Sequence, residues 1–339
     1  MRQTNGGSLW GLAIGEGASD LHAAPGHRPM LRIDGLLQAL SGDPLTDREV
    51  VALLGDCLTE EQRGELEERG TLECAYQTES GERFRISAQI VEGKHVMSAR
   101  LIPSSVPTLE SVRMPDVVVH LCRKRHGLVI FTGPSGCGKS TSMAAILAAV
   151  MSEIPLHVVT LEDPVEFRFE SGGSLVSQRE LGADFHSFSA ELGRLLRQDA
   201  DIVMVGEMRD LESMRNAITL AETGHLVMTT LHTADAVQTI HRIVANFPAH
   251  EQNLVRNRLA STLTAIVAQQ LLPKVGGGRV ANREILVRTN AVSNLIREDR
   301  MLELRNVLET NAEVGMTTFA RDLQRLVGEG LVEPRLLPV

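Results

Sequence analysis

The chain has 339 residues, enough for about two domains of ordinary size. Its 34 Lys and Arg residues are outnumbered by 43 Asp and Glu residues, and only 3% of all residues are aromatic. A formal net charge of −9 and so few stacking rings argue against nucleic acid as a partner, because binding to a polyanion requires a basic surface.

The cysteines and the apolar segments bear on metal binding and location. The four cysteines show no C-x-x-C spacing, which argues against a zinc site and a disulfide framework; they are Cys57, Cys74, Cys122 and Cys137. The first 30 residues lack the pattern of a secretory signal, and the longest apolar stretch, residues 143–151, is too short to span a membrane. We therefore expect a cytoplasmic protein without zinc.

The N-terminal third predicts an antiparallel sheet with some helices. Residues 84–91 alternate between apolar and polar side chains, as expected for a strand with one buried face. Residues 92–93, Glu-Gly, can form a two-residue turn, and the apolar alternation resumes over residues 97–101. These segments predict a β-hairpin.

The register of this hairpin places Arg85 directly opposite Arg100 on the polar face. Like charges in that arrangement are destabilising unless an anion lies between them, and a phosphate group is the obvious candidate. The alternative is that both guanidinium groups extend into water or pair with surface acids.

Residues 102–115 are expected to be a linker. They contain three prolines and three serines, which suits a connection better than a core element. We therefore place an N-terminal domain at residues 1–101 and a second domain at residues 116–339.

Short apolar runs in the second domain predict buried strands, at residues 128–131, 157–160, 202–205 and 226–231. Helical periods lie between them, at residues 188–196 and 211–221. This alternation predicts an α/β fold with a parallel sheet. From about residue 250 to residue 339 the pattern reads as helical only, with one long helix over 254–267 and a later helix over 319–327.

Residues 133–140 read Gly-Pro-Ser-Gly-Cys-Gly-Lys-Ser and fit the phosphate-loop pattern G-x-x-x-x-G-K-[ST], between a predicted strand and a helix-forming run. In such a loop, backbone N–H groups and the helix N-terminus bind phosphates, Lys139 reaches the outer phosphates, and the Ser140 hydroxyl coordinates Mg²⁺. The predicted nucleotide-binding residues are Ser135, Gly136, Cys137, Gly138, Lys139, Ser140 and Thr141.

Two acidic segments follow predicted strands. Glu162, Asp163 and Glu166 form the first, and such carboxylates can activate water and hold the hydration shell of a metal ion, with Asp163 a further candidate on the metal side. The alternative is a polar loop that ends at a proline. In the second segment Gly206 stands where many Walker B segments have aspartate, so Glu207 alone serves the Mg²⁺ side.

In this order the segments resemble the secretion ATPase superfamily, and within it the PilT-type retraction ATPases of type IV pili. Residues 17–22 and 32–35 are similar to the opening segment of that family, 161–167 to its Asp box, 205–210 to its Walker B segment and 223–233 to its His box. The two histidines of the last segment, His225 and His232, would on their own more often be structural than catalytic, and no zinc ligands accompany them.

Two observations favour the retraction subfamily. Residues 291–298, Ala-Val-Ser-Asn-Leu-Ile-Arg-Glu, resemble the Ala-Ile-Arg-Asn-Leu-Ile-Arg-Glu segment of retraction motors. The four-cysteine zinc element of pilus-assembly and type II secretion ATPases has no counterpart, because no cysteine follows Cys137. The chain departs from the family at Ser293, where arginine is usual, and at Ala200, where proline is usual.

The resemblance implies a PAS-like N-terminal α/β domain and a RecA-like ATPase domain with a helical C-terminal region. It implies ATP and Mg²⁺ as cofactors, a homo-hexameric ring at the cytoplasmic face of the inner membrane, a pilus platform protein as partner, and possible contacts with paralogous pilus ATPases. The roles it implies are water activation by Glu162, Mg²⁺ binding through water by Glu207, coupling by His225 and His232, and nucleotide contacts by Arg85 and Arg100.

The expected function is therefore ATP hydrolysis that drives pilus retraction. One alternative is a related motor for pilus assembly or for type II or type IVB secretion. Another alternative, of a different class, is a nucleotide-gated binding protein that signals by conformation without useful turnover.

Overall fold

The computed structural model describes residues 8–102, 105–208 and 210–336, and the chain divides into two compact units, Met1–Ser105 and Val106–Val339. Each unit has its own sheet and its own hydrophobic core. Among the described residues, no helix has the length and apolar character needed to cross a membrane.

The N-terminal unit is built on a six-stranded sheet in the order β3-β2-β1-β6-β5-β4, and all of its strand pairs are antiparallel. The strands are β1 (Asp20–Ala23), β2 (Met30–Ile33), β3 (Leu36–Ala39), β4 (Thr71–Gln77), β5 (Arg83–Val91) and β6 (Lys94–Ile102). The helices are α1 (Leu9–Gly15), α2 (Asp47–Cys57) and α3 (Glu60–Arg69). Capping boxes at Thr46 and Thr59 fix where α2 and α3 begin, because each threonine hydroxyl accepts a hydrogen bond from a backbone N–H of the first turn.

The predicted hairpin is confirmed. β5 and β6 pair in antiparallel register around the turn, with Val91 opposite Lys94 and Arg85 opposite Arg100. Both turn residues, Glu92 and Gly93, have positive φ, as expected for a turn whose twist matches that of the flanking strands.

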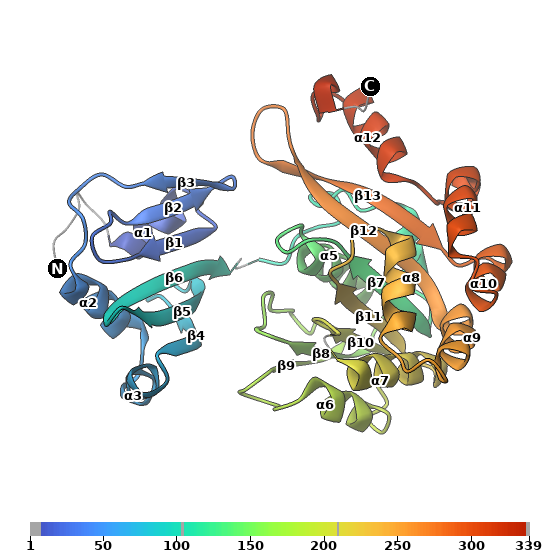
Figure 1. The fold of residues 1–339 in the computed structure, drawn as a ribbon, viewed down its shortest axis with the longest axis horizontal. Coiled ribbons are helices and arrows are strands. Elements are labelled where there is room, and N and C mark those ends of the chain that lie inside the picture. Colours follow the sequence, from blue (N-terminus) through green and yellow to red (C-terminus); the bar gives the residue numbers. More distant parts are fainter. Residues whose placement is uncertain (1–7, 103–104, 209, 337–339) are drawn as a thin grey trace. The chain divides into compact units, whose positions relative to one another are not determined.

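The second unit contains a seven-stranded sheet in the order β13-β12-β7-β11-β10-β8-β9 (Figure 1). All neighbouring strands are parallel except β12 and β13, which are antiparallel. The strands are β7 (Gly127–Thr132), β8 (His157–Glu162), β9 (Leu175–Glu180), β10 (Ile202–Val205), β11 (Leu226–Leu231), β12 (Leu263–Pro273) and β13 (Arg279–Val287). The predicted parallel sheet of an α/β fold is thus confirmed.

The helices of this unit are α4 (Asp116–Cys122), α5 (Lys139–Glu153), α6 (Phe188–Leu195), α7 (Leu211–Glu222), α8 (Ala236–Ala245), α9 (Gln252–Thr262), α10 (Asn290–Arg297), α11 (Leu304–Thr310) and α12 (Phe319–Gly328). Short 3₁₀ turns lie at Met301–Glu303, Ala312–Val314 and Pro334–Leu336. The apolar residues of β7, β8, β10 and β11 form the centre of the core together with α5 and α7.

The prediction of a purely helical segment after residue 250 is wrong. The helix α9 ends at Thr262, and the chain continues at once into β12, which forms a long hairpin with β13 (Figure 1). β12 lies between β7 and β13 in the sheet, and residues 263–269 are all buried, so side chains on both of its faces are covered. A continuous apolar run of this kind does not distinguish a buried strand from a buried helix by its periodicity.

Candidate active site

The phosphate loop (residues 133–140) connects the end of β7 to the start of α5. Its three glycines, Gly133, Gly136 and Gly138, have φ values of +139°, +75° and +86°, which residues with side chains rarely adopt. A Cβ atom at Gly133 would overlap with the backbone oxygen of Gln269. The loop therefore packs so closely against β12 that only glycine fits there.

Lys139 is folded back onto this loop. Its Nζ donates hydrogen bonds to Gly133 O at 2.7 Å and to Pro134 O at 3.0 Å. The side chain is buried, and this burial lowers the pKa of Lys139. The ammonium group of Lys139 thus places a positive charge inside the loop, at the N-terminus of α5, where an anion is stabilised.

Glu162 is the last residue of β8 and is buried. Its carboxylate accepts hydrogen bonds from Thr160 Oγ1 at 2.7 Å, from Gln178 Nε2 at 3.2 Å and from the backbone N–H of Glu166 at 3.4 Å. Burial raises the pKa of Glu162, because the ionised form is poorly solvated there, and the hydrogen bonds oppose this shift. A carboxylate that is held in place and has a raised pKa is suited to act as a general base.

Glu207 and His232 meet at the same edge of the sheet. Glu207 follows β10 and His232 follows β11, and His232 Nε2 lies 3.3 Å from Glu207 Oε2. The neighbouring Thr233 is bonded to the strand that leads into the phosphate loop, since its N–H donates to Thr132 Oγ1 at 2.9 Å. The loop and the ends of three adjacent strands are thereby joined.

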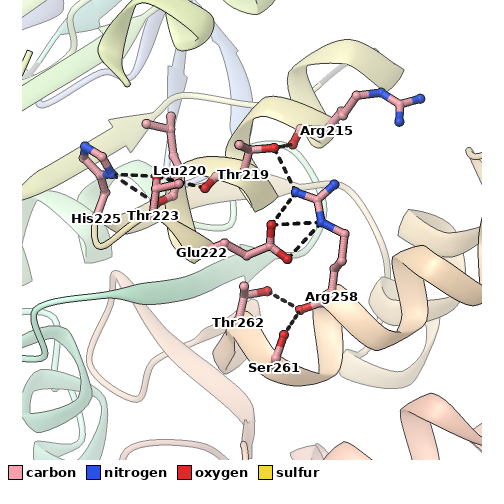
Figure 2. Close-up of polar contacts among 9 residues, drawn as sticks. All are labelled: Arg215, Thr219, Leu220, Glu222, Thr223, His225, Arg258, Ser261 and Thr262. Carbon is pink, nitrogen blue, oxygen red and sulfur yellow. Dashed lines mark hydrogen bonds and ion pairs between the residues drawn. The ribbon is translucent and has the colours of Figure 1, made fainter. Parts of the chain in front are cut away.

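The structure places His225 elsewhere. It precedes β11, whereas His232 follows it, and the six residues of β11 separate the two histidines by roughly 20 Å. Figure 2 shows His225 Nδ1 beside Leu220 O at 3.1 Å and Thr223 Oγ1 at 3.3 Å, next to the pair formed by Glu222 and Arg258. His225 is therefore at the edge of the sheet opposite the phosphate loop of its own chain.

Arg85 and Arg100 lie in the N-terminal unit, and each has a carboxylate partner there. Arg85 Nη2 donates to Glu73 Oε2 at 2.6 Å, and Arg100 Nε donates to Asp20 Oδ1 at 2.8 Å. The structure thus shows the alternative in which both guanidinium groups pair with acids, and a contact of these arginines with a nucleotide stays a prediction.

Two residues that shape the site were not identified from the sequence. Gln178 on β9 contacts Glu162, and Gln269 on β12 contacts the carbonyl of Cys137 in the phosphate loop. Neither belongs to a motif, and the pairing of β8 with β9 and of β7 with β12 brings them to the site.

The donor set fits a magnesium ion bound together with a nucleotide. Within the described part of the chain, no group of three or more His, Cys, Asp or Glu side chains could hold a metal ion alone. Mg²⁺ usually keeps several waters and is bound by one or two protein groups and the phosphates of its substrate. Ser140 in the first turn of α5 and Glu207 after β10, at the same edge of the sheet, would provide such groups.

A parallel sheet with a phosphate loop after β7 and carboxylates at the ends of β8 and β10, at the same edge, defines a P-loop nucleotide-binding protein. The sequence model of the family described as type II/IV secretion system protein matches residues 65–322. The chain belongs to this family, and the resemblance to secretion ATPases of the PilT type is confirmed.

Three known proteins show how far the similarity extends. The type IV pilus retraction ATPase PilT of Pseudomonas aeruginosa is 43% identical over 324 residues, which cover 96% of this chain and 94% of PilT. A crystal structure of the pilus retraction motor PilT with bound ADP has a TM-score of 0.86 at 38% identity and covers 96% of this chain and 94% of its own. An X-ray structure of the Legionella pneumophila ATPase DotB has a TM-score of 0.86 at 27% identity, with 96% and 92% covered.

Proposed function

We propose that this chain is an ATPase motor that hydrolyses MgATP at the phosphate loop and drives the retraction of type IV pili. The observation that carries the proposal is the convergence of Lys139, Glu162 and Glu207 at one edge of the sheet, in a chain that aligns with 94% of PilT. The PilT crystal structure with ADP supports nucleotide as the ligand of this loop.

In this mechanism the loop N–H groups and the N-terminus of α5 bind the phosphates. Lys139 exchanges its contacts with Gly133 O and Pro134 O for contacts with the outer phosphates. Bound Mg²⁺, held by Ser140 and by Glu207 through water, would neutralise charge that develops on the phosphates, with Asp163 as a further candidate on the metal side.

Glu162 acts as the base. It accepts a proton from the attacking water while the bond from water oxygen to the γ-phosphorus forms and the bond to the β,γ-bridging oxygen breaks. Thr160 and Gln178 hold its carboxylate in place, so the free-energy cost of reorienting Glu162 during the reaction is small.

The proposal includes a homo-hexameric ring at the cytoplasmic face of the inner membrane that acts on a pilus platform protein, with contacts to paralogous pilus ATPases. Arg85 and Arg100 would contribute to the nucleotide site of a neighbouring subunit by exchanging Glu73 and Asp20 for phosphate. His232 would couple the state of the nucleotide to movement, whereas His225 would act at the other edge of the sheet, away from the nucleotide of its own chain.

A deletion strain tests this function. It should keep surface pili and lose twitching, and wild type but not Glu162→Gln should restore movement. Loss of pili or of secretion would instead support an assembly or secretion motor, an alternative that is compatible with the match to the family described as type II/IV secretion system protein. Phosphate release no faster than that of Lys139→Ala would support a binding protein without useful turnover.

A further inference from the structure

Arg283 on β13 is a buried cation directly behind the phosphate loop. Arg283 is only 1% exposed, and its guanidinium group donates hydrogen bonds to neutral acceptors. Burial lowers the pKa of Arg283 to about 10, so it remains charged at neutral pH. The negative charge of Asp322, which accepts from the backbone N–H of Arg283, partly opposes this shift. Within the described part of the chain the guanidinium itself bonds to neutral acceptors, and burying a charge in this way is costly, which points to a specific role.

Gln269 joins Arg283 to the phosphate loop. The two residues lie directly opposite each other on β12 and β13, and Arg283 Nε donates to Gln269 Oε1 at 2.9 Å. The same oxygen accepts from Ser142 Oγ on α5 at 2.9 Å. The amide nitrogen of Gln269 donates to the backbone oxygen of Cys137 within the loop. Gln269 thereby holds one loop carbonyl on the side of β12.

The other side of Arg283 holds the segment that precedes α4. Its Nη2 donates to Val112 O at 2.8 Å, and its Nη1 donates to Arg113 O at 3.0 Å. This segment is itself a hydrogen-bonded turn, in which the N–H of Met114 donates to Leu109 O at 3.0 Å. Along the chain it leads from the N-terminal unit into the second unit.

We propose that Gln269 and Arg283 are positioning residues that link occupancy of the phosphate loop to residues 112–114. The proposal rests on the proposed nucleotide site. Phosphates draw the loop N–H groups inward, and a loop whose Cys137 carbonyl is held by Gln269 is already arranged for them. Any shift of that carbonyl on binding or release changes the bond from Gln269 to Arg283, and through it the bonds to Val112 and Arg113.

The test measures hydrogen exchange at the backbone amides of residues 112–114 and the Kd for MgADP. In the wild type, MgADP should slow exchange at these amides. Gln269→Met breaks the contact with the loop but leaves the Arg283 bonds to Val112 and Arg113 in place. We expect it to raise Kd about tenfold, equal to about 1.4 kcal/mol, and to abolish the effect of MgADP on residues 112–114 without changing their exchange in its absence.

Arg283→Met should in addition speed exchange at residues 112–114 without nucleotide. If that variant fails to fold, Arg283→Lys replaces it, because lysine keeps the charge but cannot bond to Gln269 and both carbonyls at once. Arg325→Met is the matched control, since Arg325 shares Asp322 with the backbone of Arg283 but has no contact with Gln269 among the described residues.

The outcomes separate the two proposals. If the wild type does not bind MgADP, the proposed function fails. If the wild type binds and Gln269→Met keeps both the wild-type Kd and the slowed exchange at residues 112–114, the link is overturned. A lower melting temperature alone, with the response of these residues intact, would mean that Gln269 and Arg283 are structural only.

Discussion

His232 Nε2 lies 3.3 Å from Glu207 Oε2, although the two residues belong to different sequence motifs and follow different strands. In the proposed mechanism Glu207 serves the metal, and His232 is followed by Thr233, which is bonded to Thr132 at the base of the phosphate loop. A movement of Glu207 can therefore affect the phosphate loop in two ways, through the bound nucleotide and through the contacts of His232 and Thr233.

We expect Glu207 and His232 to act as a pair. His232→Ala should lower kcat, because the side chain of Glu207 loses one of the partners that orient it. A double-mutant cycle with Glu207→Gln should give a coupling free energy of about 0.5–3 kcal/mol in kcat/KM. Additive effects of the two substitutions would show that the contact has no role in turnover.

His250→Ala is the control for this cycle. His250 also has a glutamate partner, Glu251 at 3.7 Å, but it lies in the connection between α8 and α9 rather than at the strand ends. Its removal should leave kcat unchanged, so a loss of turnover there would point to a general effect of removing histidines.

The raised pKa of Glu162 predicts how turnover depends on pH. The carboxylate acts as a base only when ionised, so kcat should fall as the pH is lowered through the pKa of Glu162 in the complex. Because burial raises this pKa, the midpoint should lie above the value of about 4.3 for an ordinary glutamate. A plot of kcat against pH under saturating ATP gives the midpoint, and one at or below that ordinary value would contradict the assignment.

Glu162→Gln checks the same residue through stability. A raised pKa in the folded state means that the stability from Glu162 is fully present below its unfolded pKa and is lost as the pH rises through its folded pKa. The glutamine variant, which does not ionise, should therefore melt no lower than the wild type at pH 8. Its kcat should fall by about 10²- to 10⁴-fold while MgADP still binds. Wild-type turnover in this variant would refute the role of Glu162 as base.

Lys139→Met should weaken nucleotide binding by about 10- to 150-fold, the range expected when a charged hydrogen-bond donor is removed. Pro134 is exposed, so its carbonyl can bind water in place of Lys139, whereas the buried carbonyl of Gly133 loses its partner. We therefore expect the variant to fold with a somewhat lower melting temperature. Calorimetric titration with MgADP measures the loss, and melting curves of the free protein check the fold. Unchanged affinity would mean that phosphates do not bind beside Lys139.

The strand β12 shows where prediction from the sequence reached its limit. The apolar spacing of Leu263, Ile266 and Val267 also fits a helix, and burial on both faces removes the alternation that marks a strand. The strands β7, β8, β10 and β11 were predictable because turn signals and a recognisable loop surround them. Nothing comparable separates β12 from α9, since the helix passes directly into the strand at Thr262.

The sequence predicted the motif residues of the site but not the residues that strand pairing brings to it. Lys139, Glu162 and Glu207 each follow a predicted strand, and the carboxyl ends of parallel strands meet at one edge of a sheet. Gln178 and Gln269 reach that edge only because β9 lies beside β8 and β12 beside β7. Strand order of this kind depends on packing between distant segments and leaves no local signal.

Two glycines of the phosphate loop provide a matched test of its packing. Both Gly133 and Gly136 have positive φ, but a Cβ at Gly133 would overlap with the backbone of Gln269, whereas a Cβ at Gly136 would meet open space. Gly136→Ala should cost about 1–2 kcal/mol of stability from backbone strain alone. Gly133→Ala should cost more than about 3 kcal/mol, since the loop must also move away from β12. Equal losses in urea unfolding without nucleotide would show that the loop does not pack on Gln269.

The position of Cys137 within the phosphate loop suggests that its thiol is reactive and that nucleotide protects it. The structure predicts the opposite, because Cys137 is 2% exposed and its burial raises the pKa of the thiol, an effect that the charge of Lys139 only partly opposes. In the folded protein, alkylation of Cys137 by iodoacetamide at pH 8 should be at least about tenfold slower than in urea, since the thiolate is the nucleophile and the thiol is covered.

MgADP should change this rate by less than about twofold, because the thiol is already shielded without it. Peptide mapping by mass spectrometry assigns the modified thiol, with Cys137→Ser as the control for the assignment. Rapid alkylation that MgADP suppresses would mean that the thiol faces the nucleotide.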